Sequence, residues 1–365
     1  MIILDTSILR GLGLKSSTAE LLRAIRESGV QRISVPWMVL EELAAQQVLK
    51  YTDSYEKACA AQEQLTKLTP WSISRLAPPR VDKVRDHWRA EYQKLTEVIE
   101  IQAEILAQAL YREANLIPPA KRAGDSPQSP KIGARDAVIW LAAVGYARSN
   151  PTEKVYFVSG NTRDFGNGES RPEELNGDLK GIESRFVQMT RVDEVVQAFA
   201  EEVKFDPALH EEMMWRSEFC ERIAKAASES LVRVWSESSI PNFFNGVRVP
   251  RPSSQISGAD GWAERADELS VSWAEWTAPP TAANLVSVED GKSYRIENKI
   301  WSIVTTRWLL IGDAFLANYN TSKIACLWTT RLLVSNDSSP VVLDYEEPRG
   351  LRPADAKSLV NVPPF

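Results

Sequence analysis

Short apolar runs alternate with helical patterns along the first two hundred residues. The runs at 1–4, 32–35 and 155–158 are dominated by Ile, Leu, Val and Phe, and continuous runs of this kind predict strands buried on both faces. Apolar residues at helical spacing predict helices over 17–28, from Pro36 to about residue 44, and from Arg135 to about residue 150. This alternation predicts an α/β layer architecture with a mainly parallel sheet.

Two long segments interrupt this alternation. Residues 52–115 carry a helical pattern broken at Pro70 and at Pro78-Pro79, which predicts a helical insertion rather than part of the sheet. Residues 117–136 are rich in Pro, Ser, Gly and basic side chains, a composition typical of a loop.

The pattern changes near residue 205, so we expect a first domain over 1–204 and a second over 205–365. In the second, 207–239 is predicted to be helical, 241–261 to be a linker, and 301–312 and 324–335 to be strands. Two alternating runs about Asp290-Gly291 predict a β-hairpin. We therefore expect a smaller α+β domain with an antiparallel sheet, with most of its tryptophans in the core, that serves target selection, oligomerisation or autoinhibition.

Composition and charge exclude several classes of site and location. The 365 residues are enough for two domains, and no run is long and apolar enough for a membrane span. Without a signal-peptide pattern, the expected location is cytoplasmic. Three widely spaced cysteines predict neither a disulfide framework nor a zinc site, and two histidines argue against histidine chemistry. A net charge of −6 argues against coating of bulk nucleic acid but permits a local basic groove.

Acidic residues follow each predicted strand of the first domain. Asp5 follows the first strand directly, Glu41 and Glu42 lie in the helix after the second, and Asp164 follows the third. Asp136 begins the helix after the basic loop. Singly, each has a simpler explanation as a helix cap, a surface residue or part of a turn. Carboxyl ends of parallel strands share one edge, however, and four carboxylates gathered there would repel one another unless a cation lay between them. Oxygen ligands alone suit Mg²⁺ or Mn²⁺.

The order of these motifs resembles that of the PIN-domain nucleases. The resemblance is carried by MIILDTSIL, VPWMVLEELAAQ, KIGARDAVIWLAA and VYFVSGNTRDF, covers roughly residues 1–200, and implies a three-layer α/β/α fold. It implies that Asp5, Glu42, Asp136 and Asp164 hold Mg²⁺ or Mn²⁺ for phosphodiester hydrolysis. Glu42 is preferred because it precedes Leu43 directly, and Glu41 stays an alternative. The matching polar positions, which would orient ligands or phosphate, are Thr6, Ser159 and Asn161.

The chain departs from compact members of that family by its insertion and by its C-terminal domain. In larger PIN-like nucleases a helical excursion at the place of the insertion helps capture the substrate strand. Here the excursion carries basic residues mixed with acids, so a plain solvated face is an equal alternative. The loop before Asp136 is the better candidate for binding nucleic acid, through its basic residues Lys121, Arg122, Lys131 and Arg135.

Three functional hypotheses follow. The first is a metal-dependent endonuclease, with RNA favoured over DNA as substrate. The second is a catalytically weak PIN-fold binding or regulatory module whose C-terminal domain recognises a partner, such as a protein regulator or a second copy of the chain. The third is a toxin-like or defence ribonuclease, which differs from the first in biological role and not in chemistry.

Overall fold

The structure, a computed structural model, describes residues 1–167, 170–237, 244–248, 270–276, 280–316, 321–335, 340–346 and 348–349. The chain divides into two compact units, Met1–Phe199 and Ala200–Phe365, each of which is considered by itself. Among the described helices, none combines the length and the apolarity needed to cross a membrane.

A five-stranded parallel sheet forms the centre of the first unit. Its strand order is β3-β2-β1-β6-β7, and each neighbouring pair is parallel. The strands are β1 (Ile2–Leu4), β2 (Ile33–Pro36), β3 (Glu97–Ile99), β6 (Val155–Val158) and β7 (Phe186–Met189). All three residues of β1 are fully buried, because helices cover both faces of the sheet. This explains why the strand is a continuous apolar run rather than an alternating one.

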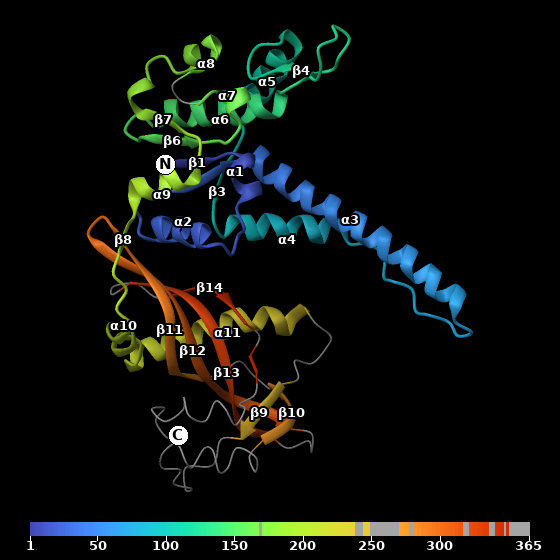
Figure 1. The fold of residues 1–365 in the computed structure, drawn as a ribbon, viewed down its shortest axis with the longest axis vertical. Coiled ribbons are helices and arrows are strands. Elements are labelled where there is room, and N and C mark those ends of the chain that lie inside the picture. The colour runs from blue at the N-terminus through green and yellow to red at the C-terminus, as the bar shows by residue number, and fades with distance from the viewer. Residues whose placement is uncertain are drawn as a thin grey trace. The chain divides into compact units, whose positions relative to one another are not determined.

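Helices complete a three-layer α/β/α arrangement, as predicted. Figure 1 shows α5, α6 and α8 on one side of the sheet and α2, α4 and α9 on the other. The helices of this unit are α1 (Thr6–Gly11), α2 (Ser17–Glu27), α3 (Trp37–Leu68), α4 (Val81–Gln93), α5 (Ala103–Asn115), α6 (Ala134–Ser149), α7 (Thr162–Phe165), α8 (Glu173–Asp178) and α9 (Val192–Phe199), with a short 3₁₀ turn at Glu183–Arg185.

Helix α6 supplies the centre of the hydrophobic core. Trp140 is fully buried and its ring lies 5.6 Å from that of Phe157, 5.9 Å from that of Phe165 and 5.5 Å from that of Phe186. The indole Nε1 donates to Asp178 at 2.8 Å, so its polar atom is satisfied inside the core. This packing fixes α6 against β6, and with it the position of the first turn of α6.

The prediction of a purely helical insertion was wrong at one point. Residues Glu97–Ile99 lie within the range 52–115 and form β3, an edge strand paired with β2. A strand of three half-buried residues has no apolar run or alternation long enough to predict it. The insertion otherwise consists of helices α3, α4 and α5 with irregular segments between them, one of which contains the predicted breaks at Pro70 and Pro78-Pro79.

Helix α3 extends beyond the body of the first unit as an arm (Figure 1). Within its 32 residues only Val39, Leu40, Leu43 and Ala44 are buried, all in its first two turns. The segment after α3 folds back along the arm, where the hydroxyl of Tyr55 donates to the carbonyl of Ala77 at 3.0 Å.

The predicted loop over 117–136 contains a short hairpin. Strands β4 (Lys121–Arg122) and β5 (Lys131–Ile132) pair in antiparallel fashion. With only two residues each, these strands leave no periodic signal in a segment rich in Pro and Ser, so composition alone indicated a loop.

The second unit is an antiparallel sheet with helices, as predicted. Its strand order is β14-β13-β9-β10-β12-β11-β8, and β12 also pairs with β13. Its elements are β8 (Glu201–Val203), α10 (Pro207–Met214), α11 (Ser217–Glu237), β9 (Phe244–Arg248), β10 (Ser270–Trp276), β11 (Ala282–Ile296), β12 (Lys299–Leu316), β13 (Thr321–Ser335) and β14 (Val341–Tyr345). The core includes Trp308 and Trp328, both fully buried, together with Phe219 of α11. Trp301 is also buried, in line with the expected role of the tryptophans.

Two local predictions for this unit were wrong. Asp290-Gly291 is not a turn but lies within β11, next to a register shift, and the chain reverses at Glu297-Asn298 between β11 and β12. A Cβ on residue 291 would lie 2.6 Å from the ring of Phe205, so the glycine serves close packing rather than a turn. The predicted linker 241–261 contains strand β9 at 244–248, and its other residues lie outside the part of the chain that is described.

Candidate active site

Asp5 lies at the carboxyl edge of the sheet, directly after β1. Its carboxylate accepts hydrogen bonds at Oδ2 from the hydroxyls of Ser7 at 2.6 Å and Ser159 at 2.8 Å, and from the amide of Ser7 at 3.3 Å. Ser159 directly follows β6, the strand beside β1, which explains why the two side chains meet. Asp5 is also the N-cap of α1. The plain interpretation as a helix cap is therefore correct, and the same side chain also belongs to the acidic group described below.

Glu42 reaches the same region from the second turn of α3. It accepts from the hydroxyl of Thr6 at 3.0 Å, and Arg10 donates to its other oxygen at 3.1 Å. Glu41 points elsewhere, because both of its oxygens are held by the guanidinium of Arg89 on α4 at 2.6–2.8 Å. The structure thus brings Glu42, and not Glu41, toward Asp5.

Asp136 lies in the first turn of α6. The preceding Gly133 has φ +119°, and a Cβ there would lie 2.6 Å from the backbone of Ala120. The glycine therefore lets the chain leading into β4 cross closely over the start of α6. The amide of Ala134 donates to the carboxylate of Glu113 at 2.7 Å, which supplies the cap that Gly133 cannot.

Asp164 lies in the short helix α7 after β6. Its Oδ2 accepts from the amide nitrogen of Asn161 at 2.9 Å, and its Oδ1 is paired with the ammonium of Lys121 from β4. The backbone amide of Asn161 donates to Ser159 at 3.1 Å. Each of the predicted polar residues donates a side-chain hydrogen bond to one of the predicted acids: Thr6 to Glu42, Ser159 to Asp5 and Asn161 to Asp164.

Three of the carboxylates lie close enough to Asp136 to affect its protonation. Burial, together with the negative charges of Asp164, Asp5 and Glu42, raises the pKa of Asp136 from 3.8 to about 6. Lys121 acts in the opposite direction and lowers it. A carboxyl pKa raised in this way indicates an acidic group whose negative charge is not fully compensated. We call Asp5, Glu42, Asp136 and Asp164 the acidic group.

The four predicted basic residues divide into two pairs. Lys121 contacts Asp164, and Arg135 lies 3.7 Å from Glu42. By contrast, Arg122 donates to the carbonyl of Ser129 at 3.1 Å within the hairpin, and the ammonium of Lys131 bonds the carbonyl of Ala114. Only the first pair lies at the acidic group.

Sequence reasoning missed Ser7 and Arg10, which also contact this group. Ser7 lies two residues after an N-cap aspartate, a spacing at which such a contact is common, so a signal was present. Its hydroxyl also accepts from the amide of Gly160 at 2.9 Å, which joins the ends of β1 and β6. Arg10 had no comparable signal, because its contact with Glu42 arises from the packing of α1 on α3.

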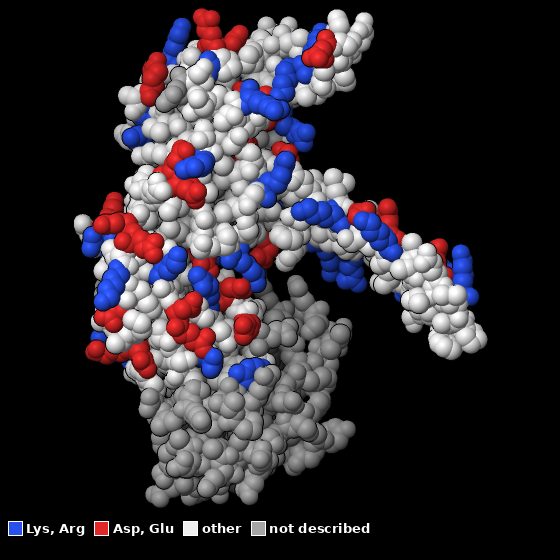
Figure 2. All heavy atoms as spheres, viewed as in Figure 1, with Lys and Arg blue, Asp and Glu red and all other residues white. Residues whose placement is uncertain are grey.

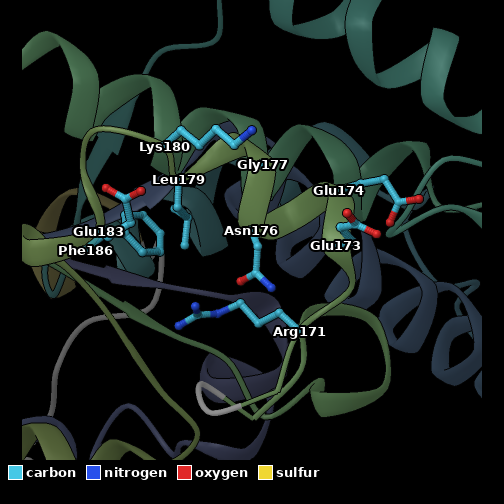
Figure 3. A pocket seen from close by; sticks show the side chains of 9 residues that line it. All are labelled: Arg171, Glu173, Glu174, Asn176, Gly177, Leu179, Lys180, Glu183 and Phe186. Carbon is cyan, nitrogen blue, oxygen red and sulfur yellow. The ribbon is translucent and has the colours of Figure 1, made fainter.

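A pocket of about 640 Å³ lies beside α8, apart from the acidic group (Figure 3). Arg171 and Asn176 line it, with the amide of Asn176 directed toward the arginine. Arg171 donates through Nε to Gln188 at 2.6 Å, and Gln188 donates to the carbonyls of Phe165 and Gly166 at 3.2 and 2.6 Å. One wall of the pocket thus supports the segment that directly follows Asp164.

The donor chemistry of the acidic group suits a hard divalent cation, since it consists of carboxylate oxygens. The arrangement does not yet form a metal cage. Among the residues that the structure describes, no three carboxylate, histidine or cysteine side chains lie together as a set that could hold a metal ion. Two of the carboxylates, Glu42 and Asp164, are paired with basic side chains.

Comparison with known protein families gives a match to the first part of the chain. Residues 2–165 match the family model described as a PIN domain. No curated protein and no solved structure matches the chain. PIN domains are generally nucleases, act on nucleic acid and typically use divalent metals. The matched range includes the whole acidic group and ends one residue after Asp164. Residues 2–165, a little less than half of the chain, are therefore similar to a PIN domain, and a further C-terminal region follows them.

Proposed function

We propose that the first unit is a metal-dependent endonuclease, and that RNA is its substrate. The observation that supports this proposal is geometric: Asp5 accepts from Ser159 at the end of β6, Glu42 accepts from Thr6 next to Asp5, and Asp164 follows β6 in α7. The raised pKa of Asp136, caused first by burial and then by the charges of the other three acids, agrees with this placement. A fold does not gather uncompensated carboxylates without cost, and active sites are where such groups are commonly found.

The metal we propose is Mg²⁺ or Mn²⁺, held by Asp5, Glu42, Asp136 and Asp164. When bound, such a cation supplies neutralisation of phosphate charge and a lowered pKa for an attacking water molecule. The chain's own residues orient the ligands. The hydroxyls of Ser7 and Ser159 hold Asp5 at Oδ2, which leaves Oδ1 without a described protein donor.

Basic side chains around the acidic group would bind the phosphates of the substrate. Lys121, Arg135 and Arg10 each contact a carboxylate of the group, and their side chains are 46%, 69% and 58% exposed. Exposed side chains of this kind can exchange a carboxylate partner for a phosphate at low cost. We favour RNA on the resemblance to the PIN-domain nucleases.

The α3 arm is a second candidate contact for a single strand. Basic side chains lie along its visible face (Figure 2), but several are paired with acids, as Lys57 is with Asp53 at 2.6 Å. Trp71 follows α3 and is 65% exposed, which gives a surface on which a base could stack. The arm therefore offers stacking in addition to charge.

A nuclease assay tests the proposal. Matched single-stranded RNA and DNA would be incubated with the full chain in Mg²⁺ or Mn²⁺, with Asp5→Asn and Asp164→Asn as inactive variants. Glu41→Gln is the control for Glu42→Gln, because Glu41 is held by Arg89 and lies outside the acidic group. We expect cleavage of RNA that is lost in both aspartate variants and in Glu42→Gln, and retained in Glu41→Gln. Cleavage that survived Asp5→Asn and Asp164→Asn would refute the proposal, and preferential cleavage of DNA would refute the choice of RNA.

One observation favours a second function. The lack of a three-ligand arrangement among the described residues would suit a PIN-fold binding module with weak catalysis, whose C-terminal region recognises a protein regulator or a second copy of the chain. Calorimetry separates the two functions, since a binding module would take up no Mg²⁺ or Mn²⁺ at millimolar concentrations.

A further inference from the structure

Two carboxylates of the acidic group, Asp164 and Glu42, are paired with basic side chains. Lys121 contacts Asp164, while Arg10 and Arg135 lie 3.1 and 3.7 Å from Glu42. These three cations come from three different elements, α1, β4 and α6. Among them Lys121 is the one that reaches the buried carboxylate, since Asp164 is only 8% exposed.

The backbone around Lys121 fixes its place at the acidic group. Gly133 permits the close crossing of Ala120 over the start of α6. Two residues before Ala120, the carbonyl of Pro118 accepts from Arg112 at 2.9 Å, and the same guanidinium is paired with Asp178 at 2.6 Å. This ion pair is largely buried, so the chain leading into β4 is anchored to the core. The position of the Lys121 backbone is therefore built into the fold, and its side chain is half-exposed where it meets Asp164.

Both oxygens of Asp164 are occupied in this arrangement. Oδ2 accepts from Asn161 at 2.9 Å, and Oδ1 is paired with Lys121. A divalent cation that used Asp164 as a ligand would need one of these oxygens. The ammonium is the partner it would displace, because two cations close to the same carboxylate oxygen repel each other, whereas the neutral amide of Asn161 does not add to this repulsion.

We propose that Lys121 is a positioning residue that occupies Asp164 in the metal-free protein and is displaced by the divalent cation, after which its ammonium is available to a phosphate of the nucleic acid. This inference rests on the proposed nuclease function and adds to it a coupling between two binding events. Lys121 weakens metal binding when substrate is absent. Metal binding in turn releases a cation for the substrate at the edge of the acidic group.

Metal binding by the full chain tests the inference without relying on activity. Isothermal titration with Mn²⁺ would compare the wild type with Lys121→Met, which removes the charge and keeps the length, and Lys121→Arg, which keeps the charge. The matched control is Lys57→Met, because Lys57 is also paired with an aspartate but lies on the α3 arm. We expect Lys121→Met to bind Mn²⁺ about fivefold more tightly than the wild type, the size of effect that a partly exposed ion pair produces. Lys121→Arg and Lys57→Met should match the wild type within about twofold.

The outcomes separate this inference from the proposed function. If the wild type binds Mn²⁺ and Lys121→Met binds it no more tightly, the displacement by metal is overturned while the metal-dependent function stands. If neither protein binds Mn²⁺ at millimolar concentrations, both are overturned. If Lys57→Met binds Mn²⁺ as tightly as Lys121→Met, the effect is one of net charge, and the specific role of Lys121 is overturned. A gain confined to Lys121→Met supports the inference.

Discussion

Replacing Asp136 by asparagine should stabilise the first unit at neutral pH. The wild-type carboxylate is partly buried beside three other acids, and its pKa is raised from 3.8 to about 6. A rise of this size corresponds to a cost of about 3 kcal/mol for keeping the group charged in the folded state. Asparagine has nearly the same shape and carries no charge, so the variant removes that cost. Since the shift is approximate, we expect a gain of between about 1 and 3 kcal/mol.

The sign of this effect depends on pH. Well below its ordinary pKa of 3.8 the carboxyl is protonated in both the folded and the unfolded chain, so Asp136 makes no difference to stability there. Between about pH 4 and pH 6 the folded state binds more protons than the unfolded state, and wild-type stability falls as the pH rises. Above about pH 6 the full cost is present. The gain from Asp136→Asn should therefore grow from near zero at pH 4 to its full value at pH 7.

Hydrogen-exchange mass spectrometry of peptides from α6, combined with urea titration, would report the unfolding free energy of this unit separately from that of the second. The control is Asp125→Asn, an exposed aspartate in the β4–β5 hairpin, whose effect should stay within about 0.5 kcal/mol. An Asp136→Asn gain that is absent at pH 7, or that is equally large at pH 4, would refute the electrostatic reasoning. Saturating Mg²⁺ should stabilise the wild type more than the variant, because a bound cation removes the same cost.

Three further predictions concern the framework around the site and the second unit. Arg112→Met should destabilise the first unit by about 3 kcal/mol or more in urea unfolding, because Asp178 would stay charged and largely buried without its cation. A loss below about 1 kcal/mol would contradict a structural role for this ion pair. Gly291→Ala should destabilise the second unit by about 1–3 kcal/mol, because the new Cβ would meet the ring of Phe205 at 2.6 Å, and an unchanged melting temperature would show that the ring yields freely. Glu297→Asn should stabilise the second unit by up to about 1 kcal/mol in thermal unfolding, because residue 297 has φ +51° in a two-residue turn where asparagine is favoured. A lower melting temperature would contradict this assignment of the turn.

The parts of the fold that could be predicted from sequence are those whose packing leaves a periodic signal. Strands β1 and β6 are buried on both faces and so appear as continuous apolar runs, and α2 begins and ends close to its predicted bounds. Strand β3 was missed because three half-buried residues at the sheet edge need no such run. At Gly291 a local turn signal was overridden by the approach of Phe205, a contact between residues far apart in sequence.

The same distinction holds for the candidate site. The order of Asp5, Glu42, Asp136 and Asp164 and the shared edge of a parallel sheet predicted that these residues lie near one another. The charges of the other three contribute, after burial, to the raised pKa of Asp136. The basic side chains that lie beside the acids could not be predicted in this way. Side-chain partners at that edge depend on how loops cross, and no local pattern separated Lys121, which reaches the acidic group, from its neighbour Arg122, which does not.

Charge compensation at the acidic group connects the stability of this unit to its proposed chemistry. Because ionising Asp136 is costly, its carboxyl must either stay protonated or have a positive charge nearby. Lys121 provides such a charge and lowers the pKa of Asp136. The ammonium can do so only incompletely, since it carries one charge and is paired with Asp164 at one side of the group. A divalent cation carries twice that charge and would relieve the repulsion more fully. If the proposed metal binds there, the electrostatic repulsion that Lys121 leaves uncompensated would contribute to the affinity for it.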